Sequence, residues 1–166
     1  MKLHPQEESP KPTLYLICGL PGAGKTTFAK KLEHSKQALR LSPDEWIAPL
    51  LADTADKAEL DRLRSPIEAL QWEITLRVLR LGINVILEWG FWAREERDGY
   101  RQKAEALGFH VETLYLKVSL EELSTRLSKR NANLPPGTFA VTQEQINLWS
   151  SWFEEPMVNE PVTYIE

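Results

Sequence analysis

The sequence predicts an α/β fold with a mainly parallel sheet, and three observations favour that fold. Apolar runs of strand length alternate along the chain with longer segments of helical periodicity, a pattern typical of β-α-β units. The first apolar run, 14–18, is continuous, as expected of a central strand that is buried on both faces. The length of 166 residues, 42% of them hydrophobic, is enough for one domain with a substantial core.

Five strands and the helices between them follow from these patterns. The expected strands are 13–18, 38–41, 84–88, 109–117 and 162–165. The expected helices are about 25–34, a short segment from the turn at 42–44 to 51, a charged surface segment 53–64, 66–81, 93–107, about 119–130 and 142–153.

Capping signals fix several helix ends. Ser65 followed by Pro66, with Glu68 three residues after the serine, predicts a helix start, and Gly82 ends that helix. Ser119 and Thr142 are expected to cap the two late helices. One core face is expected on the helix 66–81, formed by Ile67, Leu70, Ile74, Val78 and Leu81.

Composition excludes several classes of protein. The net charge of −4 gives no broad footprint for nucleic acid or a membrane, and no apolar run approaches the ~20 residues of a membrane helix. The single cysteine, Cys18, cannot form an internal disulfide. Residues 1–12 are polar and lack the apolar segment of a signal peptide, so we expect a loose tail, one domain over 13–166 and a cytoplasmic protein.

The turn after the first strand has the spacing of a Walker A phosphate loop, G-x-x-x-x-G-K-[ST]. It consists of Gly19, Leu20, Pro21, Gly22, Ala23, Gly24, Lys25 and Thr26, followed by Thr27. Glycines allow backbone N–H groups to wrap a polyphosphate, and the helix that follows directs its positive end at the phosphates. We expect Lys25 to reach the β- and γ-phosphates, Thr26 to bind Mg²⁺ and Thr27 to lie near the α-phosphate. ATP and Mg²⁺ are therefore the expected cofactors.

The rest of the chain favours a kinase over other nucleotide-binding classes. No Asn-Lys-x-Asp run, used by GTPases to read guanine, is present, and a motor ATPase would need a larger body. A kinase needs a base near the acceptor hydroxyl, an acceptor pocket, cations for the transferred group and a lid that excludes water.

Two carboxylates follow strands of the predicted sheet. Asp44 comes after the second strand, where it could accept a proton from the acceptor hydroxyl or instead only cap a helix. Ser42 could be the cap, with Pro43 at the first helical position. Glu88 ends the third strand and could hold Mg²⁺ through water, bind the acceptor, or be a surface acid.

Cationic and aromatic residues complete the candidate site. Arg126 and Arg130 lie four residues apart beside the irregular segment 131–140, so they suit a lid over about 126–142, although Glu122 could pair with them on a solvated face. Arg94 could bind acceptor or phosphate, or lie in a first helical turn. The aromatics Trp46, Trp89, Phe91 and Trp92 could form an acceptor wall or pack in the core.

These motifs resemble the small P-loop kinases. The match is carried by 19–27, Ser42-Pro43-Asp44, Val85-Ile86-Leu87-Glu88 and the arginine-bearing lid, and it spans about 13–157. Within that family the chain is most similar to the group of chloramphenicol phosphotransferase, the zeta toxins and the polynucleotide 5′-kinase domain. The run 152–156, Trp-Phe-Glu-Glu-Pro, is similar to the end of the lid helix in gluconate kinases.

The resemblance implies a three-layer P-loop NTPase fold with a five-stranded parallel core and a mobile lid. It also implies ATP·Mg²⁺ as donor, a hydroxyl as acceptor, Asp44 as base and Arg126 and Arg130 as lid cations. Two departures lie where an acceptor would bind: Glu88 replaces the aspartate of many members, and 53–64 matches no known acceptor site.

Four functions compete on this evidence. A small-molecule O-kinase leads, because aromatics near Asp44 and Glu88 suit an acceptor with an apolar body. A polynucleotide 5′-hydroxyl kinase would need a positive channel, which the acidic segment 53–61 disfavours. A zeta-like kinase of a nucleotide sugar and a non-catalytic ATP-binding switch are the other two.

Overall fold

The structure, a computed structural model, describes residues 11–51, 57–136 and 138–165, and it confirms the α/β fold. One sheet of five parallel strands has the order β2-β3-β1-β4-β5. The strands are β1 (Thr13–Cys18), β2 (Ala38–Leu41), β3 (Asn84–Gly90), β4 (His110–Leu116) and β5 (Val162–Ile165).

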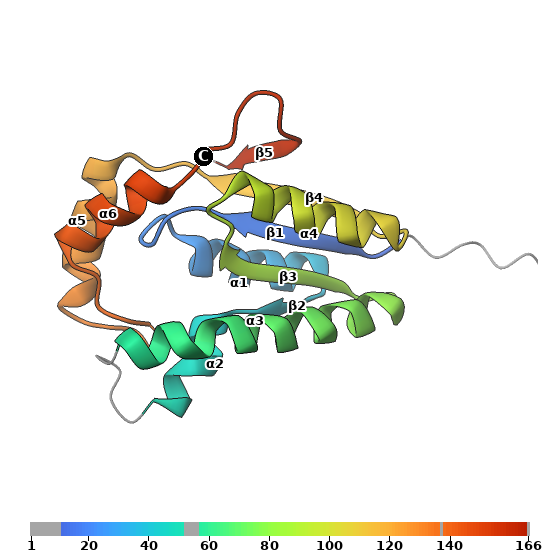
Figure 1. The fold of residues 1–166 in the computed structure, drawn as a ribbon, viewed down its shortest axis with the longest axis horizontal. Helices are drawn as coiled ribbons and strands as arrows, with labels where there is room; N and C mark the ends of the chain where they lie inside the picture. The colour runs from blue at the N-terminus through green and yellow to red at the C-terminus, as the bar shows by residue number, and fades with distance from the viewer. Residues whose placement is uncertain (1–10, 52–56, 137, 166) are drawn as a thin grey trace, which may run out of the picture.

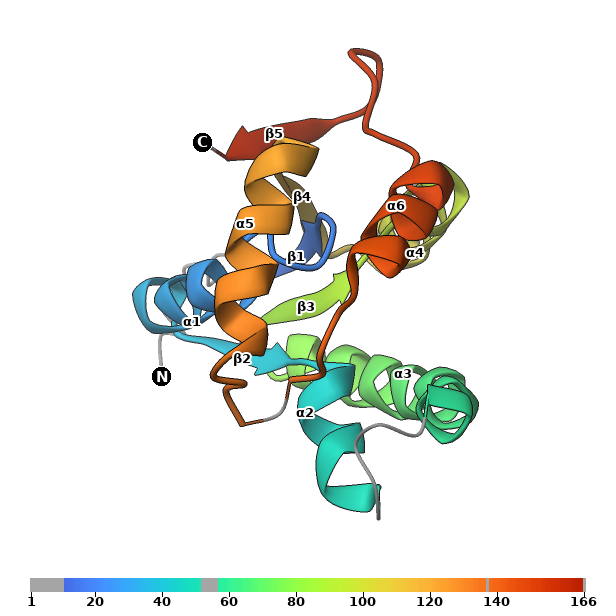
Figure 2. The same ribbon diagram turned by 90° about the vertical axis from the view of Figure 1, so that its left-hand side faces the viewer.

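Helices cover both faces of the sheet, which gives the expected three layers. One face carries α1 (Lys25–Lys36), and the other carries α3 (Lys57–Arg80) and α4 (Arg94–Ala106) (Figures 1 and 2). The remaining helices, α2 (Pro43–Ile47), η1 (Ala48–Leu50), α5 (Leu120–Asn131) and α6 (Gln143–Trp152), lie toward the carboxyl ends of the strands (Figure 1). In parallel sheets this edge is where ligands bind.

Alternation along β1 builds two hydrophobic layers. Leu14, Leu16 and Cys18 belong to the core cluster that includes Trp89 and Phe91. Tyr15 and Ile17 belong to the cluster on the opposite face, together with Ala29 of α1. Five successive buried residues on one strand confirm a central strand enclosed on both faces.

The two helices expected between 53 and 81 form one helix in the described residues. α3 runs without interruption from Lys57 to Arg80, with Pro66 inside it, so Ser65 is not an N-cap. Proline has no N–H to donate to the preceding turn, but the rest of the helical ladder and the packing of its later turns carry it through this position. The first part of the predicted charged segment, 53–56, lies outside the described residues.

The core face of α3 is also rotated from the predicted one. Its buried residues are Ile67, Gln71, Thr75 and Leu79. Leu70 and Leu81 are exposed. The apolar spacing alone missed this rotation because Gln71 and Thr75, which are polar, hydrogen-bond within the buried face.

The caps of the late helices are confirmed. The Ser119 hydroxyl accepts a hydrogen bond from the backbone N–H of Glu122, and Thr142 forms a reciprocal capping box with Gln145. Among the described residues, no helix is long and apolar enough to cross a membrane.

Candidate functional site

The Walker A residues form the turn between β1 and α1. Gly24 is the N-cap of α1 in the left-handed region, with φ of 93°, and the N–H of Gly19 donates to the carbonyl of Gly90 at 2.9 Å. The loop is thus tied to the end of β3, and α1 begins at Lys25. This is the strand–loop–helix context that the motif requires for phosphate binding.

Gly22 is the glycine that this loop can least replace. A Cβ at this position would lie 2.9 Å from Cγ of Leu127 in α5, and its φ is +86°. Gly108, in the turn before β4, has the same φ but nothing within 4 Å of such a Cβ. Comparing substitutions at Gly22 and Gly108 therefore separates the effect of backbone strain from that of the close contact with α5.

We expect Gly22→Ala and Gly108→Ala each to lose about 1–2 kcal/mol of unfolding free energy from the left-handed backbone. Only Gly22→Ala should in addition weaken nucleotide binding, because relief of the Leu127 contact moves the loop or α5. Urea unfolding and nucleotide titration of both variants check this. Equal nucleotide affinity in the two variants would contradict the role given to Gly22.

Lys25 is held in the loop by one backbone contact. Its ammonium donates to the carbonyl of Leu20 at 2.9 Å. Lys25 is half-buried, and desolvation lowers its pKa to about 8, against the opposing effect of Glu88 and Asp44. A bound polyphosphate would favour the charged form and raise that pKa again.

Nucleotide affinity should therefore fall as the pH rises through about 8. Below this pH, Lys25 is already charged in the free protein; above it, binding must take up a proton, so the dissociation constant should be about tenfold larger at pH 9 than at pH 7. Calorimetry in buffers of different ionisation enthalpy would detect the proton uptake. Lys25→Arg, whose guanidinium stays charged, should lose this pH dependence; if it is retained, another group is responsible.

Thr26 and Glu88 lie together at the expected metal position. The Thr26 hydroxyl donates to Oε1 of Glu88, and Oε2 of Glu88 accepts from Nη1 of Arg40 at 2.6 Å. Because the hydroxyl hydrogen points at Glu88, the Thr26 oxygen keeps lone pairs for a cation. Mg²⁺ is commonly held by one or two protein oxygens, waters and substrate phosphates, which fits this pair. Elsewhere in the described residues, no group of three or more His, Cys, Asp or Glu could hold a metal.

Asp44 lies in the first turn of α2, and its side chain is not a helix cap. Ser42 occupies the N-cap position, without a side-chain hydrogen bond, and Pro43 is the first helical residue. The Asp44 carboxylate instead accepts from Nη2 of Arg64 at 2.5 Å, with 43% of its side chain exposed. It interacts electrostatically with Lys25 and with Arg130.

Both predicted lid arginines lie on α5, and Arg126 contacts the phosphate loop. Arg126 forms the ion pair with Glu122 that was the alternative to a lid role. Its Nη1 also lies 3.4 Å from the carbonyl of Ala23 in the phosphate loop. Arg130 donates to the carbonyl of Phe139 at 2.9 Å, and its Nε is buried without a hydrogen-bond partner. Burial lowers the pKa of Arg130. An orphaned buried donor near Lys25 and Asp44 fits an anion such as a terminal phosphate.

For two of the aromatics named as acceptor contacts, the structure shows the alternative of packing in the core. Trp89 is 7% exposed, stacks on Phe91 and donates its indole N–H to Gln71, so it is a core residue. Trp46 is half-buried and packs against the same core cluster. The pattern could not separate these roles, because an aromatic residue beside a strand end packs inward as readily as it faces a ligand.

Arg94 lies in the first turn of α4, which is one of the two alternatives left open for it. Its backbone N–H donates to Glu154, and its guanidinium contacts Asp98 and Asn159, with Glu160 at 3.9 Å. These partners belong to α4 and to the segment before β5, and they hold Arg94 as a structural residue. Trp92 stays near the loop: a Cβ at Gly90 would lie 2.9 Å from its Nε1, and its ring packs against Trp149 of α6.

Three arginines near the site were not predicted from the sequence to have a role there. Arg64 contacts Asp44 but lay in a charged stretch that resembled solvated surface. Arg97 is fully buried, bidentate to Glu160, and donates to the carbonyls of Phe91 and Trp92, so it fixes the turn after β3. Arg40 was detectable, because a charge inside the apolar four-residue strand Ala38–Leu41 signals a buried partner.

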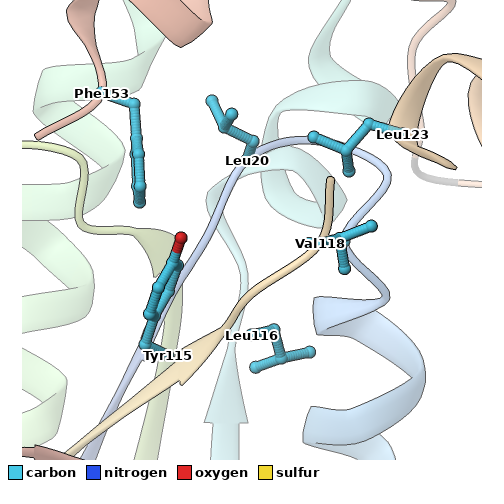
Figure 3. Close-up of a pocket in the computed structure, with 7 residues that line it drawn as sticks. Leu20, Tyr115, Leu116, Val118, Leu123 and Phe153 are labelled. Carbon is cyan, nitrogen blue, oxygen red and sulfur yellow. The ribbon is translucent and has the colours of Figure 1, made fainter. Parts of the chain in front are cut away.

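A small apolar cavity lies behind the phosphate loop. It measures about 10 Å³ and is lined by Leu20, Ala23, Tyr115, Leu116, Val118, Leu123 and Phe153 (Figure 3). That volume suits at most one water molecule, so this cavity is a packing gap and not an acceptor site.

Comparison with known proteins decides the family. Residues 14–156 match the family model of an AAA domain (AAA_33). The chain belongs to this AAA-domain family. No curated protein sequence matches it.

Solved structures share the fold of this AAA domain. A candidate kinase from Chloroflexus aurantiacus J-10-fl superposes with a TM-score of 0.74 at 19% identity, covering 93% of this chain and 85% of that one. A gluconokinase from Sinorhizobium meliloti 1021 superposes with a TM-score of 0.63 at 17% identity, covering 93% of this chain and 82% of that one. Chaetomium thermophilum Kti12, in complex with ADP-AlF3, superposes with a TM-score of 0.63 at 17% identity, covering 92% of this chain and 88% of that one. The AAA domain thus has the P-loop kinase fold.

Proposed function

We propose that this AAA domain is a kinase that transfers the γ-phosphate of ATP, with Mg²⁺, to a hydroxyl of a small-molecule acceptor. The observation that supports it most is the place of Asp44: its carboxylate lies in the first turn of α2, is 43% exposed and pairs with Arg64 instead of capping the helix. A nucleotide switch needs cations for the phosphates and a metal ligand, but it has no need for a second, partly exposed carboxylate that can take a proton. A kinase needs such a carboxylate as well.

In this proposal each residue has one role. Asp44 orients the acceptor hydroxyl and takes its proton as the oxygen–phosphorus bond forms and the bond to the β-phosphate oxygen breaks. Lys25 stabilises the charge that develops on the β- and γ-phosphates, and Arg126 and Arg130 approach the transferred group as the lid over about 126–142 closes. Thr26 and Glu88 would hold Mg²⁺, which supplies charge neutralisation when bound.

The neighbourhood of Asp44 favours a small acceptor over a nucleic acid. Arg64, which contacts Asp44, also lies 3.5 Å from Glu68 and interacts electrostatically with Glu96. Three carboxylates around one arginine would repel a polyphosphate chain. A 5′-hydroxyl oligonucleotide is therefore the weaker candidate acceptor.

ATP consumption measured with and without acceptor pools tests the proposal. The pools are hydroxylated metabolites, nucleosides and nucleotide sugars, aminoglycosides and other antibiotics, and a 5′-hydroxyl oligonucleotide. We expect one small-molecule pool to stimulate ADP formation by the wild type and not by Asp44→Asn. ATP binding without stimulation by any pool would favour the switch, and stimulation by the oligonucleotide alone would favour a polynucleotide kinase.

A further inference from the structure

Arg40 lies at the centre of an ionic network in which its pair with Glu88 is buried, while Glu33 and Glu45 are partly exposed. Its side chain, on β2, is only 8% exposed. Nη2 donates to both carboxylate oxygens of Glu45 at 2.8 Å, and Nη1 donates to Oε2 of Glu88 at 2.6 Å. Nε lies 3.5 Å from Glu33, without a hydrogen bond.

Such a network is a poor source of stability. Taking a guanidinium and a carboxylate out of water costs several kcal/mol per ion, and an apolar replacement for a buried ion pair is often neutral or stabilising. Glu88 is only 5% exposed at its side chain, so its desolvation is nearly complete. The arrangement is better explained by what it holds in place than by what it adds to the folding free energy.

The network joins the two carboxylates that the mechanism needs. Arg40 takes one oxygen of Glu88, which leaves the other directed at the Thr26 hydroxyl. The same guanidinium hydrogen-bonds Glu45, the residue after Asp44 in the first turn of α2. A planar guanidinium can hold both partners at fixed angles, whereas an ammonium cannot.

We propose that Arg40 is a positioning residue that sets Glu88 toward the Mg²⁺ position and anchors the α2 turn that carries Asp44. Glutamate is one methylene longer than aspartate and has one more free rotation, so a Glu88 without Arg40 would sample orientations in which its oxygens miss the metal's water ligands. This inference rests on the proposed use of Mg²⁺, and it concerns Arg40, which acts on the metal position through Glu88.

The test compares ADP binding in Mg²⁺ with ADP binding in EDTA, by calorimetry, for the wild type and Arg40→Lys. The ratio of the two dissociation constants is the Mg²⁺ effect. Loss of an outer-shell partner lowers metal affinity by about 10–100-fold, so the Mg²⁺ effect should shrink about tenfold or more in Arg40→Lys, while ADP binding in EDTA stays within about twofold. Arg62→Lys, at an exposed arginine of α3, is the matched control and should behave as wild type.

A double-mutant cycle shows whether Arg40 acts through Glu88. Glu88→Gln alone should lose the Mg²⁺ effect, and Arg40→Lys/Glu88→Gln should lose little more, because the two residues act as one unit. Additive losses would overturn the inference, as would an Arg40→Lys variant whose only change is a lower melting temperature. A wild type whose ADP binding ignores Mg²⁺ would overturn the metal part of the proposed function and this inference with it, so the two failures are distinguishable.

Discussion

Asp44→Asn is expected to lower the rate of phosphoryl transfer by about 10²–10⁴-fold while ATP binding changes little. The amide keeps the shape of the side chain but cannot accept the hydroxyl proton. In the described residues the Asp44 carboxylate is hydrogen-bonded to Arg64 and not to the phosphate loop, so nucleotide binding does not depend on it directly. Single-turnover kinetics with the acceptor found in the pooled assay would measure the loss.

The loss should be specific to this carboxylate. Its ion pair with Arg64 is partly exposed, so breaking it should cost at most about 1 kcal/mol of stability, and the variant should fold. Asp61→Asn, at an exposed position of α3, is the control and should keep full activity. Transfer within a few-fold of wild type in Asp44→Asn would show that Asp44 is not the base.

Lys25→Ala is expected to lower kcat by about 10²–10³-fold, because it removes a preorganised cation aimed at the developing charge. It should also weaken ATP binding, since the ammonium of the phosphate loop is replaced by a methyl group that cannot donate to phosphate. Lys30→Ala, exposed on the same helix, is the matched control. Unchanged binding and turnover in Lys25→Ala would contradict the assignment of the phosphate loop.

Local patterns predicted the fold and the phosphate loop because each signal is confined to a few adjacent residues. The continuous apolar run of β1, the glycines of 19–24 and the caps at Ser119 and Thr142 specify their own conformations. Pro66 is ambiguous in the sequence, because a proline at a helix start and a proline inside a helix have the same local pattern. Tertiary packing decided between them.

The acceptor side depends on contacts between distant residues, which the sequence alone could not supply. Arg64 meets Asp44 across 20 residues, and Arg40 meets Glu88 across 48. Trp89 could be placed in the core only once Gln71 was seen to accept its N–H, 18 residues earlier in the chain. Spacing along the chain predicts which residues share a helix face, but not which residues of other elements face them.

The central claim is that this AAA domain moves a phosphoryl group to an organic hydroxyl. Following ³²P from the γ-position of ATP, in the presence of the stimulating pool, tests it most directly. The account predicts label on one organic product, formed in equal amount with ADP and absent with Asp44→Asn. Label found only in inorganic phosphate would contradict it, because the protein would then be an ATPase in which Asp44 accepts a proton from water.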